Sequence, residues 1–371
     1  MTERTRFSPL AQCDDVTIDP AKTDRLDNYL AEAGLEAVWF ARPANFAWLT
    51  GANNIVDREA GVGVAAAGYD GSLRILTSNN EAPRFAEEEF GDVPVESFPW
   101  HEGTLAEAVA ERSERPFETD FDVSGAERVP ATRLRTPLTD TDIERYRELG
   151  NETATALESV CRIIESTDSE RAVAARLRER LVARGIDSPV LLVGGEERAH
   201  AYRHFPPTDT DIGGYALVSV TAQRGGLHAS ATRTVALDPP DWLAARHEAA
   251  MRVEAAAVAA TKRLSNEGTA GDVFREIRNA YAEIRYPDEW QKHHQGGATG
   301  FAGREWKATP ASTADLQTPM AYAWNPTVEG AKSEDTVLVG DGVETLTATG
   351  EWPVREIDVD SATVVRHAVG P

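Results

Sequence analysis

The stretch YALVSVTAQRGGLHASATRTVAL, residues 215–237, decides the fold of this chain. Two runs rich in Val, Thr, Leu and Ala flank Arg224-Gly225-Gly226, and this pattern predicts a β-hairpin with a glycine-containing turn. Alternate residues of a strand face the same way, so one face of the hairpin carries hydroxyl groups and a histidine but no carboxylate. We expect this face to line a pocket at the centre of a domain. Its residues are Ser219, Thr221, His228, Ser230 and Thr232.

Helical and strand patterns lie on both sides of the hairpin. A chain of 371 residues is long for one compact core and suits two domains of unequal size. Thr139 followed by Asp142 predicts the capped start of a long helix, which places the domain boundary near Pro137. We expect an α+β protein with a smaller N-terminal α/β domain, residues 1–136, and a larger domain, residues 137–371. Helices are predicted at 23–33, 102–112, 139–164, 169–184, 239–264 and 269–284, strands at 36–40, 61–67, 73–76, 188–193, 321–324, 336–339 and 345–347, and a loop at 42–51.

The composition is strongly acidic. Against 61 acidic residues there are 38 basic ones, which gives a formal net charge of -23 and a pI near 4.8. Only five basic residues are lysines, and an acidic, lysine-poor surface is typical of proteins that stay dispersed in concentrated salt, so we expect a salt-loving source. Such a charge repels nucleic acid and anionic membranes, and neither is an expected partner.

The compartment is predicted from what the chain carries and what it lacks. Cys13 and Cys161 lie far apart, with no metal-like spacing, which favours a reduced, cytoplasmic protein. The opening MTERTRFSPL has no apolar segment that could serve as a signal peptide, and no apolar run approaches the length needed to span a membrane.

Four separated stretches carry a family resemblance: HFPPTD at 204–209, SATRT at 230–234, GGATGFAGRE at 296–305 and SEDTVLVGDG at 333–342. In this order they resemble the creatinase, prolidase and aminopeptidase P family. The resemblance covers nearly all of the chain. It implies a small N-terminal α/β domain, a C-terminal "pita-bread" domain, and a homodimer in which one subunit helps to close the pocket of the other.

Peptidases of that family bind two divalent metals through Asp, Asp, His, Glu and Glu. When their motifs are laid on this chain, these five positions fall on Ser219, Ser230, Gly297, Asn325 and Glu334, so one ligand of five is kept. Hard divalent cations need anionic oxygen ligands, and two such ions close together need several carboxylates to offset their repulsion. We therefore expect neither a metal nor another cofactor. A single zinc ion held by His228, His293 and His294 is conceivable, but adjacent histidines rarely ligate one ion.

Other family positions keep residues that can do chemistry. His204 lies where the resemblance implies a substrate-binding histidine, the position that creatinase uses as its acid/base, and His293 matches a second pocket histidine. Creatinase hydrolyses a guanidino C–N bond in this fold without metal, because a histidine of near-neutral pKa can activate water. We expect His204, His293 and Glu334 to be catalytic. The expected substrate-binding residues are His228, His294, Gln295, Arg304, Glu305 and Asn325.

Structural roles are open for several of these residues. His204 could be a loop histidine bonded to backbone, and Glu305 and Glu334 could be ion-pair partners of Arg304 or Arg233. Three further histidines, His101, His247 and His367, are expected at the surface.

Three functions therefore remain open for the chain. The leading hypothesis is a metal-independent hydrolase acting on a C–N bond of a small amidino, amide or peptide-like substrate. The alternatives are an Xaa-Pro peptidase with an altered metal site, and a non-catalytic module that binds a peptide or a metabolite.

Overall fold

The computed structural model describes residues 18–359 and 362–371, so that Cys13 and the opening segment lie outside it. The chain divides into two compact units between Arg135 and Thr136, where the sequence predicts a boundary between 136 and 137. Both units mix helices and strands, which confirms the predicted α+β class. No helix among the described residues is long and apolar enough to cross a membrane.

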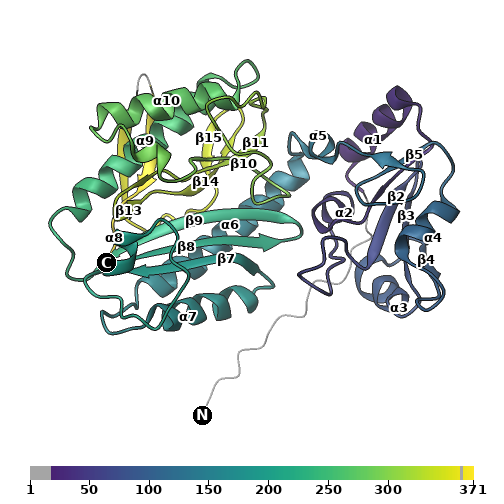
Figure 1. Cartoon of the computed structure of the whole chain (residues 1–371), viewed down its shortest axis with the longest axis horizontal. Coiled ribbons are helices and arrows are strands. Elements are labelled where there is room, and N and C mark those ends of the chain that lie inside the picture. The colour runs from purple at the N-terminus through teal and green to yellow at the C-terminus, as the bar shows by residue number, and fades with distance from the viewer. Residues whose placement is uncertain (1–17, 360–361) are drawn as a thin grey trace, which may run out of the picture. The chain divides into compact units, whose positions relative to one another are not determined.

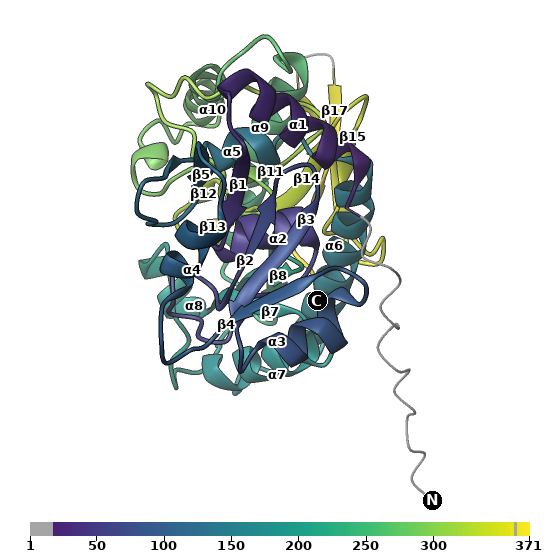
Figure 2. The same cartoon turned by 90° about the vertical axis from the view of Figure 1, so that its right-hand side faces the viewer.

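The N-terminal unit is built on one six-stranded mixed sheet with the strand order β4-β3-β2-β1-β5-β6. Figure 2 labels strands β1 to β4 of this sheet side by side. Its centre is apolar, and the side chains of Trp39, Phe40 and Phe46 are fully buried. The strands are β1 Ala37–Phe40, β2 Ala65–Tyr69, β3 Leu73–Ser78, β4 Val95–Phe98, β5 Phe117–Thr119 and β6 Glu127–Arg128. The helices are α1 Pro20–Ala33, α2 Pro43–Thr50, α3 Ala82–Arg84, a π-helical turn Phe85–Phe90, α4 Leu105–Arg112 and α5 Ala131–Arg135.

Helix α2 corrects the loop that the sequence predicts at residues 42–51. Pro43 occupies its first turn, where the fixed φ of proline suits a helix start, and Gly51 ends it in the left-handed conformation with φ 75°. Six of the eight helical residues are buried, so their aromatic side chains are part of the core and not of an exposed loop.

The C-terminal unit contains two antiparallel sheets, of strand order β7-β8-β9 and β10-β11-β14-β15, and two short hairpins (Figure 1). Helix α6 packs against β8 and β9, α7 against β7, and α9 against α10 and the hairpins. The helices are α6 Asp140–Cys161, α7 Glu170–Val182, α8 Glu196–Ala201, α9 Leu243–Arg263, α10 Ala270–Glu283 and a 3-10 turn Glu289–Gln291. The strands are β7 Asp187–Gly195, β8 Tyr215–Arg224, β9 Leu227–Ala236, β10 Gly296–Thr299, β11 Met320–Trp324, β12 Thr327–Val328, β13 Ala331–Lys332, β14 Asp335–Val339, β15 Val343–Thr345, β16 Val354–Val359 and β17 Ala362–His367.

The predicted hairpin is formed by β8 and β9. Its two-residue turn is Gly225-Gly226, with φ 54° and 81°. A type I′ hairpin turn requires positive φ at both central residues, which glycine adopts without strain. The register pairs Ser219 with Thr232 and Thr221 with Ser230, which confirms that these hydroxyls share one face. The two sheets meet at β9 and β14, where the Ser230 amide donates to Thr336 Oγ1 over 2.8 Å and the Thr232 amide donates to the Glu334 carbonyl over 2.9 Å.

Candidate functional site

A cavity of about 470 Å3 lies over the hydroxyl-bearing face of the hairpin in the C-terminal unit. Hydrogen bonds across the strands tie this face together, because the side-chain oxygens of Ser219 and Thr232 are 2.7 Å apart and those of Thr221 and Ser230 are 2.9 Å apart. The lining residues include Ser219, Thr221, His204, His228, His294, Arg304, Lys307, Asn325, Lys332 and Glu334.

The Glu334 carboxylate lies at the floor of the cavity and is held by two cations. Its Oε2 is 2.6 Å from the Lys332 ammonium and accepts from Thr232 Oγ1 over 3.0 Å, while Oε1 accepts from the Arg304 guanidinium over 3.1 Å. Burial alone would raise the pKa of Glu334, but the two cations outweigh it and lower the pKa to about 2. Glu334 is therefore ionised at neutral pH, and both of its oxygens are engaged. Of the two ion-pair partners that the sequence left open, Arg304 contacts Glu334, whereas Arg233 contacts Glu158 and Asp335.

The same two cations reach the serines that replace the aspartates of the related peptidases. Lys332 Nζ donates to Ser219 Oγ over 3.3 Å, and an Arg304 nitrogen donates to Ser230 Oγ over 3.4 Å. Each cation thus bridges Glu334 and one serine. The Glu334 carboxylate is therefore neutralised by two protein side chains, Lys332 and Arg304.

The remaining two family positions also differ from metal ligands in their surroundings. A Cβ atom on Gly297 would lie 2.1 Å from the Trp306 carbonyl oxygen, so the backbone leaves no room for a histidine side chain. Asn325 is 3% exposed and its Oδ1 has no hydrogen-bond partner within the described ranges. Two serines, a glycine and an asparagine, beside a carboxylate that is already paired with Lys332 and Arg304, do not fit a dinuclear metal centre.

Three histidines converge at the rim of this cavity. His204 Nε2 is 3.2 Å from His293 Nε2, and the rings of His293 and His294 are stacked with their centroids 4.3 Å apart. Ligand atoms of all three lie within 4.8 Å of one another, close enough for one metal ion, and this group contains His204 where the sequence suggested His228. Lys332, Lys307 and Arg304 border the same space. A divalent ion on the three histidines would lie beside three cations against the single carboxylate of Glu334, so the surroundings oppose a metal here.

All three histidines are held neutral. Burial, and then the Lys332 ammonium, lowers the pKa of His204 below its ordinary value and that of His293 to about 2. Burial and then the Arg304 guanidinium lower the pKa of His294 to about 4. A neutral imidazole has one unprotonated nitrogen with a lone pair, so each ring can accept a hydrogen bond at pH 7.

This neutrality predicts a loss of stability in mild acid. An unfolded histidine titrates near pH 6.5, and His293 and His294 titrate lower in the folded protein, so between about pH 6.5 and 4 the unfolded chain binds more protons. The unfolding free energy should then decrease as the pH is lowered through this range, by on the order of 1–3 kcal/mol from these two residues after allowance for solvent screening. Denaturant unfolding at several pH values measures it. The variant His293→Gln/His294→Gln should show a shallower slope, and equal slopes would contradict the prediction.

Several predicted site residues lie elsewhere than expected. The Gln295 side chain is fully buried and donates to the carbonyls of Trp290 and His293 over 3.3 and 2.6 Å, so it supports the histidine loop instead of facing the cavity. Glu305 Oε1 accepts from the Ala302 amide over 3.2 Å, and Glu305 does not border the cavity either. His228 does border it.

Two of the three histidines expected at the surface are buried. His247 and His367 are 3% and 7% exposed. His247 bonds to Thr234 and to the His367 carbonyl, and His367 Nδ1 lies 2.6 Å from Asp335 Oδ2. Both were wrongly placed because their partners are far away in the sequence. His101 is exposed, as predicted.

Lys332 and Lys307 were not predicted as site residues. A signal for them existed, because lysine occurs only five times in the chain and two of the five fall beside the GGATGFAGRE and SEDTVLVGDG motifs. A strongly charged residue of a rare type next to a motif is a candidate for the site that the motif builds.

Comparisons with known proteins agree with this architecture. The model of the creatinase/prolidase N-terminal domain matches residues 22–222, and the model of metallopeptidase family M24 matches residues 144–341. The prolidase from Pyrococcus horikoshii OT3 superposes with a TM-score of 0.71 at 19% identity, covering 88% of this chain and 98% of the prolidase. No match was found among curated protein sequences.

Two further solved structures show how widely the fold is used. The Xaa-Pro dipeptidase from Bacillus anthracis has a TM-score of 0.71 at 18% identity, covering 88% of this chain and 96% of the dipeptidase. The N-terminal domain of FACT complex subunit SPT16 from chickpea, Cicer arietinum, has a TM-score of 0.63 at 13% identity, with coverage of 90% and 98%. The fold is thus a creatinase-type N-terminal domain followed by a pita-bread domain. Because the M24 model matches more than half of its residues, the chain belongs to metallopeptidase family M24.

Proposed function

We propose that this protein is a hydrolase that cleaves a C–N bond in a small molecule without the dinuclear metal centre of its relatives. One observation carries the proposal: the Glu334 carboxylate is paired with Lys332 and Arg304, and these two cations also bind the serines at the former aspartate positions. Fixed positive charge of this kind stabilises the negative charge that develops on a substrate oxygen during the reaction. A metal ion has the same effect in metal-dependent hydrolases.

His204 would act as the acid/base. Its neutral imidazole takes a proton from water while the water oxygen bonds to the substrate carbon, and the imidazolium then gives that proton to the departing nitrogen as the C–N bond breaks. The 3.2 Å contact between the Nε2 atoms of His204 and His293 orients the His204 ring. His294 stacks on the ring of His293 and helps to hold it in place. Prolidases and Xaa-Pro dipeptidases among the similar structures support an amide or peptide-like bond as the target.

Metal analysis and a chelator test separate this proposal from an Xaa-Pro peptidase with an altered metal site. Protein purified without an affinity tag should contain well below one divalent ion per chain. Hydrolysis of a panel of amide, ureido, amidino and Xaa-Pro compounds should proceed equally with and without a chelator. Two tightly held ions per chain, or activity that appears only after addition of manganese, cobalt or zinc, would overturn the proposal.

A second candidate is a module that binds a small molecule or a peptide without chemistry. It is favoured by the state of Glu334, the only carboxylate that borders the cavity in the described part of the chain, whose two oxygens are already engaged. The N-terminal domain of FACT complex subunit SPT16, which shares the fold, supports such a role. Specific binding of a small ligand, with no hydrolysis across the whole panel, would favour this candidate.

A further inference from the structure

The charge around the cavity is opposite in sign to the charge of the chain. The whole molecule carries a formal net charge of -23, yet Arg304, Lys307 and Lys332 border the cavity against one carboxylate, Glu334. His204, His293 and His294 are neutral at pH 7 and add no charge. The three cations therefore exceed the one carboxylate by two positive charges. Two of the five lysines of the chain are gathered here. A positive cavity in an acidic protein focuses small anions.

The lining also has hydrogen-bonding groups to spare. An ammonium has three N–H donors, and the contacts of Lys332 with Glu334 and Ser219 leave one of them over. Arg304 Nε is buried and lacks a partner within residues 18–359 and 362–371. Lys307 takes part in no ion pair or hydrogen bond with any residue in those ranges, and its side chain is exposed to the cavity.

An independent observation points to a bound molecule. Asn325 borders the cavity, is 3% exposed, and has a side-chain oxygen with no partner inside the described ranges. A buried amide left without a partner costs free energy, and a ligand that hydrogen-bonds to it removes this cost. The amide of Asn325 can offer either an acceptor or a donor, which suits an amide or ureido group of the ligand.

We infer that the cavity recognises a small organic dianion whose two acidic groups match the two uncompensated charges of Arg304, Lys307 and Lys332. The inference rests on the proposed function for the nature of the scissile bond. Together they name the substrate class as an N-acyl or ureido derivative of an amino-dicarboxylic acid, with Asn325 beside its amide group. Amidino cations are excluded, because the same lining repels them.

Binding measurements with matched probes test the inference. Isothermal titration calorimetry at one fixed salt concentration would compare succinate and N-acetylaspartate, which carry two negative charges, with neutral succinamide. The two dianions should bind at least about ten times more tightly than succinamide, and their affinity should fall as salt is raised. Equal affinity for succinate and succinamide would overturn the inference.

Charge-reversal variants locate the binding. Lys307→Glu should weaken N-acetylaspartate binding at least about tenfold, and it should fold normally because Lys307 is exposed and makes no ion pair with any described residue. Arg178→Glu is the control, since Arg178 is exposed, makes no ion pair with any described residue and does not border the cavity, and it should leave the affinity unchanged. Lys332→Met should also weaken binding, although it leaves the buried Glu334 with Arg304 alone. Unchanged binding in Lys307→Glu, or binding of zinc in place of the anions, would contradict the inference.

The same measurements keep this inference separate from the proposed function. Succinate has no bond to cleave, so its binding is independent of catalysis. Binding of succinate without hydrolysis of N-acetylaspartate or its ureido counterpart would sustain the anion site and remove the hydrolase. Hydrolysis of neutral amides without binding of any dianion would sustain the hydrolase and remove the anion site.

Discussion

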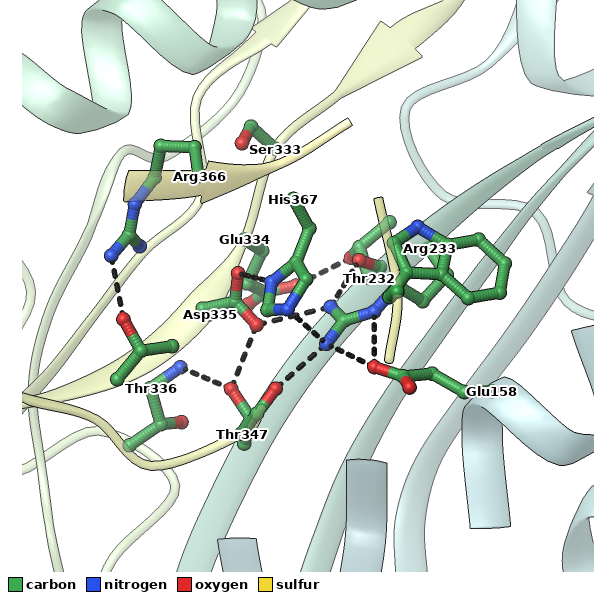
Figure 3. Close-up of polar contacts among 12 residues, drawn as sticks. Glu158, Thr232, Arg233, Ser333, Glu334, Asp335, Thr336, Thr347, Arg366 and His367 are labelled. Carbon is green, nitrogen blue, oxygen red and sulfur yellow. Dashed lines mark hydrogen bonds and ion pairs between the residues drawn. The ribbon is translucent and has the colours of Figure 1, made fainter. Parts of the chain in front are cut away.

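Replacing Arg233 with Met should lower the unfolding free energy of the C-terminal unit by roughly 3–5 kcal/mol, because it leaves buried carboxylates without their counter-charge. Arg233 is 1% exposed and lies within a network of polar contacts (Figure 3). Its guanidinium donates to Glu158 Oε1 over 3.1 and 3.0 Å, to Asp335 Oδ1 over 3.0 Å and to the Thr347 carbonyl over 2.7 Å. Glu158 and Asp335 are themselves almost completely buried.

Denaturant unfolding of matched variants measures this loss. The exposed pair Arg147–Glu344 is the control, with a closest contact of 2.8 Å and side chains that are 51% and 44% exposed. Arg147→Met should cost less than about 1 kcal/mol, since water replaces the lost contact. Adding Glu158→Gln to Arg233→Met should recover part of the loss by removing one stranded charge. If Arg233→Met costs no more than Arg147→Met, the network contributes little to stability.

The network also bears on the site, because Asp335 directly follows Glu334. Asp335 is fixed by Arg233, by Thr347 Oγ1 over 2.8 Å and by the buried His367 at 2.6 Å, and Figure 3 shows these side chains directed toward one another. Burial alone would raise the pKa of Asp335, but His367 and Arg233 outweigh it and hold the pKa below its ordinary range. Asp335 and Glu334 are neighbours in the chain, so the backbone beside Glu334 is anchored by this network while its carboxylate is held by Lys332 and Arg304.

Local signals in the sequence were sufficient to predict the hairpin β8–β9 and the helix starts of the C-terminal unit. The register of the hairpin follows from alternating side chains and from Gly225-Gly226, both readable within one short stretch. Thr139 and Asp142 alone predict the capped start of α6, where the structure has a capping box, and the predicted helix 269–284 agrees with α10. Such features depend on neighbours in the chain, so composition and spacing reveal them.

Features that depend on distant partners could not be predicted in this way. His367 can be buried because Asp335 and Arg233 supply hydrogen-bond partners for its two ring nitrogens. These partners are 32 and 134 residues away in the sequence. Helix α2 was missed although Pro43 and Gly51 mark its ends, since its continuous burial gives it no amphipathic pattern. The hairpin β16–β17 was not predicted at all. Arg304 lies 30 residues from Glu334 in the sequence, so its contact with that carboxylate could not be predicted from local spacing either.

Replacing His204 with Ala should lower kcat/KM by about 100- to 10,000-fold on the substrate that the panel identifies, which is the range that general acid–base catalysis supplies. His204 lines the cavity and its Nε2 contacts His293 Nε2, so its ring can reach both the substrate and its supporting imidazole. Binding of succinate should change little, because the charges that hold the anion stay in place. An acid/base role therefore predicts a loss in kcat with ligand affinity retained.

The control for this variant is His200→Ala on the same segment. His200 is 43% exposed, lies 3.8 Å from Glu329 and does not border the cavity, so its removal should leave kcat/KM within about twofold. Since burial and Lys332 lower the pKa of His204, the base should already be active in mildly acidic solution, and the acidic limb of the wild-type pH–rate profile should lie below pH 6.5. A loss no larger than that of His200→Ala, or an unchanged acidic limb in His204→Ala, would remove His204 from the reaction. The fixed charges of Lys332 and Arg304 would then be left as the source of any catalysis, because Glu334 is already bound to both of them.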